Sequence, residues 1–406
     1  MEVTRQFNAK PTLALPEFIA LAAMLTSLVA LSIDAILPAM DLLASDLHSS
    51  SSQQTQLSIS VFFVGMALGQ LFFGPFSDAK GRLPAISLGL VIFGIGSAIC
   101  MFSTNMNMFL IGRVVQAFGA SGPRIASTAA IRDIYSGNAM ARVMSFIMMV
   151  FILVPMLAPI IGQWIINAYT WHGIFVMFIG VGGVSGVWYF LRQPETYPKA
   201  LRKSFSWGQL GQSLTFIFSH RKVMNYILAT GCIFGCFLAY ISASHTIFVG
   251  YYGQEAAFPY IFSSLAFSIG LASYFNGKMV MRFGMQKLVK HALRGAISFS
   301  IVLLAVLFFY NGLPPLMVTL SVLFVGFFFV GILFGNMNAM AMEHLGHIAG
   351  LGAAIVGSLS NAISVPVAIV IDSYLDGNLY SIGIGFLVCF SLAKINMKMA
   401  ALPSKS

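Results

Sequence analysis

The sequence predicts an all-α integral membrane protein in which twelve helices cross the bilayer in two halves of six. Of the 406 residues, 58% are hydrophobic and only 8% are charged, whereas soluble domains carry roughly 25% charged residues. Lipid must therefore solvate most of the surface. Unbroken apolar runs such as Ile86–Phe102 and Val223–Ile241 approach the roughly 20 residues that a helix needs to cross the hydrocarbon core. They are too long for the short alternating strands of a membrane barrel.

Hydropathy and the breaks between apolar runs place the spans in chain order. In the first half we expect helices at 17–40, 57–76, 83–103, 106–128, 141–166 and 172–191. In the second half we expect them at 223–249, 256–277, 291–311, 314–336, 348–371 and 378–397. The break from Arg192 to Lys222 is the longest polar segment. It divides the chain into a six-helix bundle at 1–191, a cytoplasmic central loop at 192–222 and a second six-helix bundle at 223–406, as in secondary transporters whose halves rock about a midplane site.

The placement of charge tests this order of helices independently. If the N-terminus lies in the cytoplasm, twenty of the 22 Lys and Arg residues fall in inner loops, and the other two, Arg113 and Arg124, lie within the fourth span. The outer loops hold acidic residues such as Asp41 and Glu255 instead. This segregation follows the positive-inside rule. We therefore expect a multi-pass protein of a bacterial inner membrane with both termini cytoplasmic, whose net charge of +10 faces anionic lipid headgroups and not nucleic acid.

A glycine-containing segment with an acid and a base follows the second span. It reads Gly74-Pro-Phe-Ser-Asp78-Ala-Lys-Gly81-Arg82, and its glycines allow a sharp turn and a close approach of two helices. Asp78 can accept a hydrogen bond from the start of the third span or pair with Arg82, and such a charge cluster can hold one conformation and break in another. An ordinary inner loop with positive charges explains the same residues. A similar segment, Gly277–Gly284, follows the eighth span and indicates an internal repeat.

Two charged residues inside spans indicate how transport could be powered. Arg113 costs at least roughly 2.5–3.5 kcal/mol in apolar surroundings unless it is paired or hydrated, so it must face the bundle interior, as must Gln116 one turn further on. Asp34 and Arg113 each lie six or seven residues from the outer end of their spans, about 10 Å deep at 1.5 Å per residue. Equal depth permits an ion pair between them.

A buried carboxyl group whose solvation changes as a cavity opens can bind and release a proton. Asp34 is therefore the candidate proton carrier, and Arg113 is the residue expected to tune it. A structural ion pair and snorkelling of Asp34 to the outer interface are the alternatives.

Polar side chains within the spans are the candidates for a substrate cavity, because polar groups in lipid need partners. Arg124 lies about 16 Å nearer the cytoplasm than Arg113 at 1.5 Å per residue, where it could contact anionic groups of a substrate or snorkel to the inner headgroups. His245 lies near the outer end of the seventh span, where it either titrates or is an interfacial side chain. Helix packing or lipid contact is the alternative for the others, which are Gln70, Gln116, Tyr240, Asn336, Asn338 and Asn361.

Two of these motifs resemble those of the major facilitator superfamily. The Gly74–Arg82 segment resembles its signature loop, and Arg113-x-x-Gln116-x-x-Gly119 resembles its fourth-helix motif. The resemblance implies a cytoplasmic latch formed by Asp78, Arg82 and an acid at the end of the fourth helix, which is here Asp133.

The fifth span resembles the antiporter motif of the same superfamily. Its core is Ala158-Pro159-Ile-Ile-Gly162, preceded by Pro155. The resemblance implies an exporter, and the Pro and Gly residues imply a bent fifth helix with a close-packed face. This segment departs from the motif where Ala158, Gln163 and Val154 replace glycines. It therefore supports the direction of transport less strongly than the other motifs support the fold.

Three further strings resemble the bicyclomycin-resistance (Bcr/CflA) group of drug:proton antiporters within the superfamily. The likeness covers nearly the whole first half and thins in the second. One departure is Ile36, where the group usually has an aromatic residue. The strings are Ser32-Ile-Asp34-Ala-Ile-Leu-Pro38-Ala, Arg132-Asp133-Ile-Tyr-Ser-Gly137 with Ala141-Arg142-Val-Met-Ser145, and Trp171-His-Gly-Ile-Phe175 leading to Pro194-Glu195-Thr196.

We therefore expect a monomeric antiporter that uses the proton gradient, without a cofactor, to export small lipophilic or amphipathic molecules. Export of an endogenous metabolite or siderophore, and proton-coupled uptake, remain open. A membrane enzyme is the third alternative, and its nearest approach to a catalytic cluster is Glu343, His344 and His347 in an inner loop. Cys232 and Cys236 lie one turn apart, but no His or carboxylate lies beside them, so no metal site is expected.

Overall fold

The computed structural model describes residues 13–49, 51–135, 137–202, 207–343, 345 and 349–401. All regular secondary structure in these ranges is helical. Six long helices form the first half: α1 (Leu15–Asp34), α3 (Ser52–Lys80), α4 (Arg82–Met101), α5 (Met106–Ile134), α6 (Gly137–Ala168) and α7 (His172–Arg192). Six more form the second half: α9 (Arg221–His245), α10 (Phe258–Phe283), α11 (Met285–Phe309), α12 (Leu316–Glu343), α13 (Ala349–Ser373) and α14 (Tyr380–Ala401).

Ten of these helices are long and apolar enough to cross a membrane, counted over the described ranges. The other two are α5 and α6. Helix α5 has 29 residues, but Arg113, Arg124, Arg132 and Asp133 lower its mean hydropathy. In α6, the stretch Leu153–Ala168 is an apolar helix that is too short to be counted by itself. The twelve long helices follow the predicted order and confirm the predicted all-α membrane fold.

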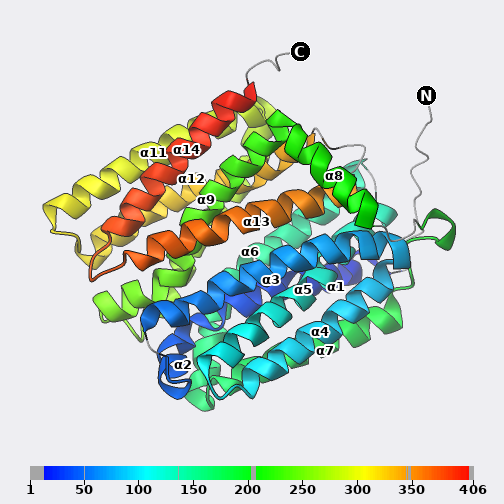
Figure 1. Cartoon of the computed structure of the whole chain (residues 1–406), viewed down its shortest axis with the longest axis horizontal. Helices are drawn as coiled ribbons and strands as arrows, with labels where there is room; N and C mark the ends of the chain where they lie inside the picture. The colour runs from blue at the N-terminus through cyan, green and yellow to red at the C-terminus, as the bar shows by residue number, and fades with distance from the viewer. Residues whose placement is uncertain are drawn as a thin grey trace.

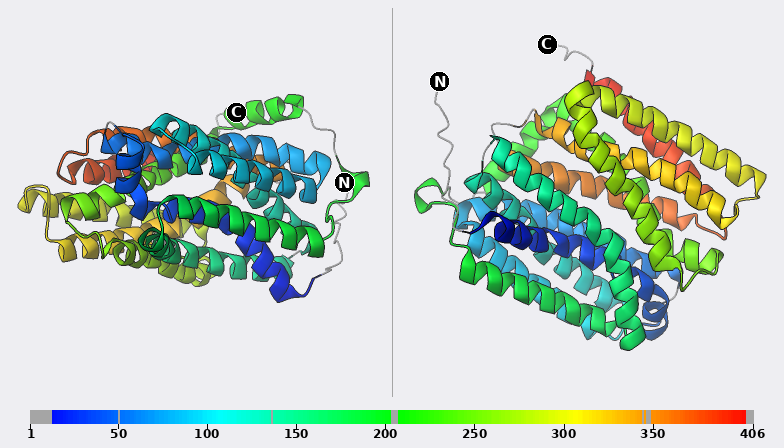
Figure 2. Two further views of the ribbon diagram at one scale, coloured as in Figure 1. Left: turned by 90° about the horizontal axis from the view of Figure 1, so that it is seen from below. Right: turned by 180° about the vertical axis from the view of Figure 1, so that it is seen from behind.

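The two halves lie side by side and meet along two seams (Figures 1 and 2). Within the first half, α5 packs against α3 and α4, and α1 packs against α5, α6 and α7. Within the second half, α9 packs against α12, α13 and α14, and α12 packs against α10 and α11. Between the halves, α3 packs against α13, and α6 packs against α10. A relative movement of the halves must change these two seams.

Short elements distinguish the two ends of the bundle. At one end, η1 (Leu37–Ala39) and α2 (Met40–Asp46) continue from α1, and a π-helical segment, η3 (Thr246–Tyr251), continues from α9. At the other end, η2 (Lys199–Leu201) and α8 (Trp207–Ser219) connect the halves (Figure 1). We call these the α2 end and the α8 end.

Helix α8 lies inside the segment that the sequence analysis treated as a polar loop. It packs against α9 and α13, with Leu210 and Ile217 buried. A short helix that buries only one face has few apolar residues. A search for long apolar membrane spans therefore does not find it.

Glycine turns occupy equivalent points of the two halves. Gly81 joins α3 to α4 at φ +108°, and Gly284 joins α10 to α11 at φ +77°. Residues with a Cβ rarely adopt this region of φ, so both turns favour glycine. The equivalence supports the predicted internal repeat. Several boundaries differ from the prediction. At the first of these turns α3 continues to Lys80, so the segment from Gly74 is the last two turns of a helix and not a loop.

Candidate functional site

Arg82 lies at the centre of a charge cluster at the α8 end. Its Nη1 donates to Asp78 Oδ1 at 2.6 Å, and its Nε donates to Asp133 Oδ2 at 2.8 Å. The turn at Gly81 places Arg82 at the first residue of α4, while Asp78 and Asp133 lie in the last turns of α3 and α5. The structure thus brings together the three residues that the resemblance implied as a latch, and it ties the ends of three helices to one guanidinium group.

The segment that follows α7 completes this cluster. Glu195 accepts hydrogen bonds from the backbone N–H groups of Arg82 at 2.9 Å and Leu83 at 3.1 Å, which are otherwise unpaired at the start of a helix. A carboxylate also interacts favourably with the helix dipole there. Thr196 Oγ1 donates to Asp133 Oδ2 at 3.1 Å, and the Tyr197 ring lies 4.2 Å from the guanidinium carbon of Arg82. In the sequence, Glu195 is notable only as part of a segment that resembles the bicyclomycin-resistance group, and nothing there predicts this role.

Gly74 belongs to the seam between the halves and not to the charge cluster. A Cβ built on Gly74 would lie 2.9 Å from the Cβ of Ala354 on α13. One turn earlier, Gln70 lies against Gly357 of the same helix. Small residues therefore allow α3 and α13 to approach closely near the α8 end.

Arg113 is fully buried and is held by neutral groups of its own half. Its Nε donates to the carbonyl oxygen of Ser58 at 3.2 Å, and its Nη1 donates to Gln116 Oε1 at 2.6 Å. Gln116 Nε2 in turn donates to Ser97 Oγ at 2.9 Å. The guanidinium group also stacks over the ring of Phe62 at 4.5 Å. This network joins α3, α4 and α5 through Nε and Nη1, whereas Nη2 of Arg113 is buried without a hydrogen-bond partner.

Asp34 is also buried, with 5% of its surface exposed, but no ion pair joins it to Arg113 or to any other cation within the described residues. The Asp34–Arg113 ion pair that equal depth permits is therefore not formed in this structure. Depth does not define the direction in which a side chain leaves its helix. Arg113 turns toward α3 and α4, whereas the end of α1 that carries Asp34 packs against α6.

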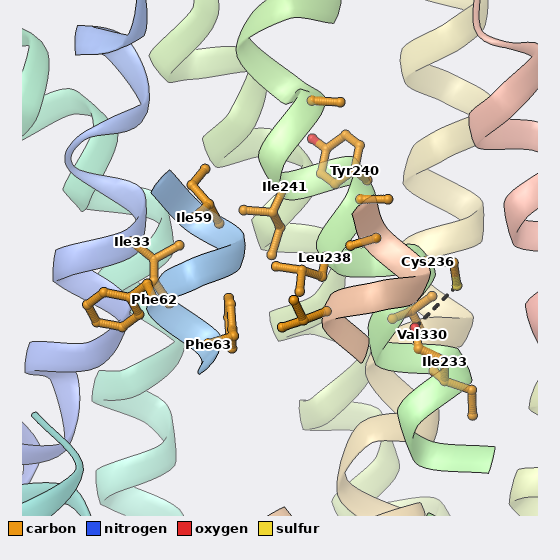
Figure 3. Packing of buried hydrophobic residues seen from close by; sticks show 14 of the residues in the cluster. Ile33, Ile59, Phe62, Phe63, Ile233, Cys236, Leu238, Tyr240, Ile241 and Val330 are labelled. Carbon is orange, nitrogen blue, oxygen red and sulfur yellow. Dashed lines mark hydrogen bonds between the residues drawn. The ribbon is translucent and has the colours of Figure 1, made fainter. Parts of the chain in front are cut away.

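Tyr240 of α9 is a buried polar group of the second half. It lies near enough to Asp34 for an electrostatic interaction, and its hydroxyl group has no hydrogen-bond partner. Figure 3 shows Tyr240 on the opposite side of the seam from Ile33, the neighbour of Asp34 in the chain, with its hydroxyl oxygen directed toward the first half. The ring packs edge-on against Phe327, with centroids 4.5 Å apart, so its position is fixed by the second half.

Two of the predicted cavity residues have structural partners instead. Gln116 belongs to the Arg113 network described above. Asn336 Nδ2 donates to Asn276 Oδ1 of α10 at 2.6 Å and to the Ile332 carbonyl oxygen at 2.8 Å. Helix packing explains both residues, as the alternative interpretation held.

Two further predicted cavity residues, Arg124 and Asn361, have donor groups available to a ligand. Arg124 lies inside the bundle, with Nη1 3.5 Å from Met66 Sδ and no acidic partner in the described part of the chain. Asn361 Nδ2 is buried without a hydrogen-bond partner. Together with Tyr240, these residues remain the candidates for substrate contact.

The antiporter-like segment of α6 sets the position of α1 at Asp34. A Cβ built on Gly162 would lie only 2.1 Å from the carbonyl oxygen of Ala35, the residue after Asp34. Ala158 and Pro159 are buried in the same helix, and Pro155 and Pro159 both lie inside it. The close-packed face predicted for this motif is therefore present, and it is directed at the end of α1 that carries the acid.

Polar contacts cross between the halves at the α2 end. Gln56 Nε2 donates to Thr246 Oγ1 at 2.9 Å, and His245 Nδ1 lies 3.6 Å from Asp41 Oδ1. His245 is 5% exposed, so it is a buried contact between halves and not an interfacial side chain. A hollow of about 540 Å³ opens nearby between α6 and α10, lined in part by Gln163, Trp164 and Glu255, but none of the candidate site residues lines it.

A model of the Major Facilitator Superfamily matches residues 22–368. The chain belongs to this superfamily. The bicyclomycin resistance protein homolog of Haemophilus influenzae is 30% identical over 350 residues, which cover 85% of this chain and 86% of that protein. The chloramphenicol resistance protein of Pseudomonas aeruginosa is 28% identical over 287 residues, 69% of this chain and 65% of that protein. The solved structure of peptide transporter POT in complex with sulfate superposes with a TM-score of 0.75 at 12% identity, over 97% of this chain and 96% of that one.

These comparisons confirm the resemblance to the major facilitator superfamily and to its bicyclomycin-resistance group, and they confirm the fold. This major facilitator protein is a transporter and not an enzyme. Of the three residues considered for a catalytic cluster, Glu343 is exposed, and His344 and His347 lie outside the described residues. Within the described residues no group of His, Cys, Asp and Glu is arranged to hold a metal ion.

Proposed function

We propose that this protein is a monomeric antiporter that exports small amphipathic molecules in exchange for protons. The observation that carries the proposal is the carboxyl group of Asp34, which is buried at the end of α1 in the first half without a cation beside it among the described residues. An uncompensated buried charge is costly, so opening this site to water on one side or the other changes whether the group is ionised. That property couples a proton to a conformational change.

In this mechanism Asp34 takes up a proton when the site opens at the α2 end, and substrate leaves on the same side. It releases the proton when the site opens at the α8 end, where substrate binds again. We propose that the α8 end faces the cytoplasm, because the basic helix ends lie there and acidic Asp41, Asp46, Glu255 and Asp376 lie at the other. A charge that crosses with the membrane potential supplies about 2.3 kcal/mol per 100 mV.

The remaining residues have supporting roles. Arg113 is not the ion-pair partner of Asp34 in this conformation, and we assign it to fixing α3, α4 and α5 around the site. The Arg82 cluster joins the ends of α3, α4 and α5 and helps to hold the outward-facing state, in which the α8 end is closed. The names of the relatives support drug export. The buried positive charge of Arg124 favours a substrate with a partial or full negative charge.

The proposal is tested in inverted membrane vesicles that hold an acidic interior, with chloramphenicol and bicyclomycin as separate probes. Wild-type protein should dissipate the pH gradient when a transported probe is added. Asp34→Asn, which keeps the size of the side chain, should abolish this response, whereas Asp376→Asn at the exposed outer loop should not. Full dissipation by Asp34→Asn would contradict the role of Asp34, and no wild-type response to either probe would favour export of an endogenous metabolite.

A further inference from the structure

A second buried acid lies in the other half of the molecule. Asp372 is the penultimate residue of α13 and is 6% exposed. Its Oδ2 forms a short hydrogen bond with Ser242 Oγ of α9, and its Oδ1 is buried without any partner. The span predicted at 348–371 ends one residue before it, so sequence reasoning left it outside the membrane helices.

No cation compensates this carboxyl group within the described residues. On α9, the neighbouring titratable groups are Tyr240 and His245. The hydroxyl of Tyr240 lies near enough to Asp34 for an electrostatic interaction, and His245 contacts Asp41. The charged residues of α3, α12 and α14 lie in the turns toward the α8 end, while Asp372 is near the α2 end. Tyr380, at the start of α14, donates its hydroxyl hydrogen to the Leu307 carbonyl oxygen at 3.2 Å.

The hydrogen-bond pattern at Ser242 provides a place for a proton. Besides Asp372, the Ser242 hydroxyl has two backbone acceptors at 3.0 Å, the carbonyl oxygens of Leu238 and Ala239. One hydroxyl hydrogen cannot serve all three acceptors. If Asp372 carries a proton, its O–H donates to Ser242 Oγ and the serine donates onward to the backbone, so every hydrogen is used. If Asp372 is ionised, the serine donates to the carboxylate and no longer to the backbone. Oδ1, which has no partner in either state, then shares a buried negative charge that no cation compensates, which is costly.

Helix α9 lies between this group and the first acid. Tyr240 and Ser242 are two residues apart, which places their side chains about 200° apart around a helix of 3.6 residues per turn. Tyr240 is directed toward the first half (Figure 3), and Ser242 is directed toward α13, which packs along α9 (Figure 1). The same helix continues into the π-helical segment whose Thr246 contacts Gln56 across the seam.

We propose that Asp372 is a second proton-binding site, so that each half of the protein carries one exchangeable carboxyl proton. Proton loss at Asp372 rearranges the Ser242 hydroxyl and therefore the α9–α13 contact, at the end of α9 that closes against the first half. The proposal goes beyond the role of Asp34, and its test requires no transported substrate.

The test is infrared difference spectroscopy of the purified full-length protein in lipid while the bath is stepped between acidic and alkaline pH. A protonated carboxyl group absorbs in a C=O stretching region separate from that of a carboxylate. The wild type should show the gain and loss of two buried carboxyl signals. Asp34→Asn should remove one and Asp372→Asn the other, whereas exposed Asp376→Asn, four residues further along, should remove neither.

A second variant guards against misfolding of Asp372→Asn. Ser242→Ala keeps the acid but removes its hydrogen-bond partner, so the Asp372 signal should persist and shift in frequency. An Asp372→Asn spectrum identical to that of the wild type would overturn the proposal, as would a Ser242→Ala spectrum with no shifted carboxyl band. Loss of the Asp34 signal has no bearing on these outcomes, so failure of the proposed antiport and failure of this inference are distinguishable.

Discussion

Gly162→Ala should disable transport through a displacement of α1. In the structure a Cβ at this position would lie 2.1 Å from the carbonyl oxygen of Ala35, whereas ordinary contact begins at 3.4 Å. Helices α1 and α6 must therefore separate by about 1.3 Å where they cross. The obstacle is backbone, which cannot rotate away as a flexible side chain could. Overpacking of this kind costs typically about 1–3 kcal/mol.

The displaced residue follows Asp34 directly, so the carboxyl group moves with it. Misplacement of a reacting group by about 1 Å can cost on the order of 100-fold in rate, and we expect proton-coupled transport to fall by at least roughly tenfold. The assay combines the thermal unfolding midpoint of purified protein with gradient dissipation in inverted vesicles. The matched control is Gly180→Ala on α7, where an added Cβ meets nothing within 4 Å. Wild-type transport and stability in Gly162→Ala would refute the reasoning.

Three other substitutions have defined outcomes. Tyr240→Phe removes a buried hydroxyl without a partner but keeps the ring against Phe327. The unfolding temperature should therefore stay the same or rise, while proton coupling weakens. Unchanged coupling would exclude a role of the hydroxyl. Arg113→Lys loses the fork that contacts both Ser58 and Gln116, and its unfolding temperature should fall further than that of Arg124→Lys, with the reverse order counting against the network. Glu195→Ala leaves two backbone N–H groups at the start of α4 without their acceptor and should cost about 1 kcal/mol, as loss of a helix cap does; equal stability of Glu195→Ala and the wild type would contradict the capping role.

The Asp78–Arg82 part of the latch was predictable because its sequence signal is local, whereas Asp133 was implied only by the resemblance to the major facilitator superfamily. Asp78 and Arg82 lie on either side of a glycine turn, and their spacing alone brings acid and base to the same turn. Glu195 comes from a segment more than one hundred residues away, and only the path of the chain after α7 places its carboxylate on the backbone of Arg82 and Leu83. Contacts of this kind follow from tertiary structure and not from spacing.

Equal depth permitted an ion pair between Asp34 and Arg113, which the structure does not form in this conformation. Hydropathy gives the level of Asp34 and Arg113 along the membrane normal but not their direction around each helix axis. The direction of Arg113 could have been inferred from Gln116, since residues three apart share a helix face and Gln116 lies against Ser97. Asp372 was missed because an apolar run ends at the first charged residue, although α13 continues through it to Ser373.

The central claim is that the protonation state of Asp34 determines the arrangement of the two halves. It is tested most directly by spin labels on exposed Leu42 of α2 and exposed Tyr374 after α13, in protein lacking its four native cysteines, with interspin distances measured at acidic and alkaline pH. The wild type should change its distance distribution with pH, and Asp34→Asn should lose most of this change and stay near the acidic distribution at both. A pH-dependent shift in Asp34→Asn equal to that of the wild type would contradict the account.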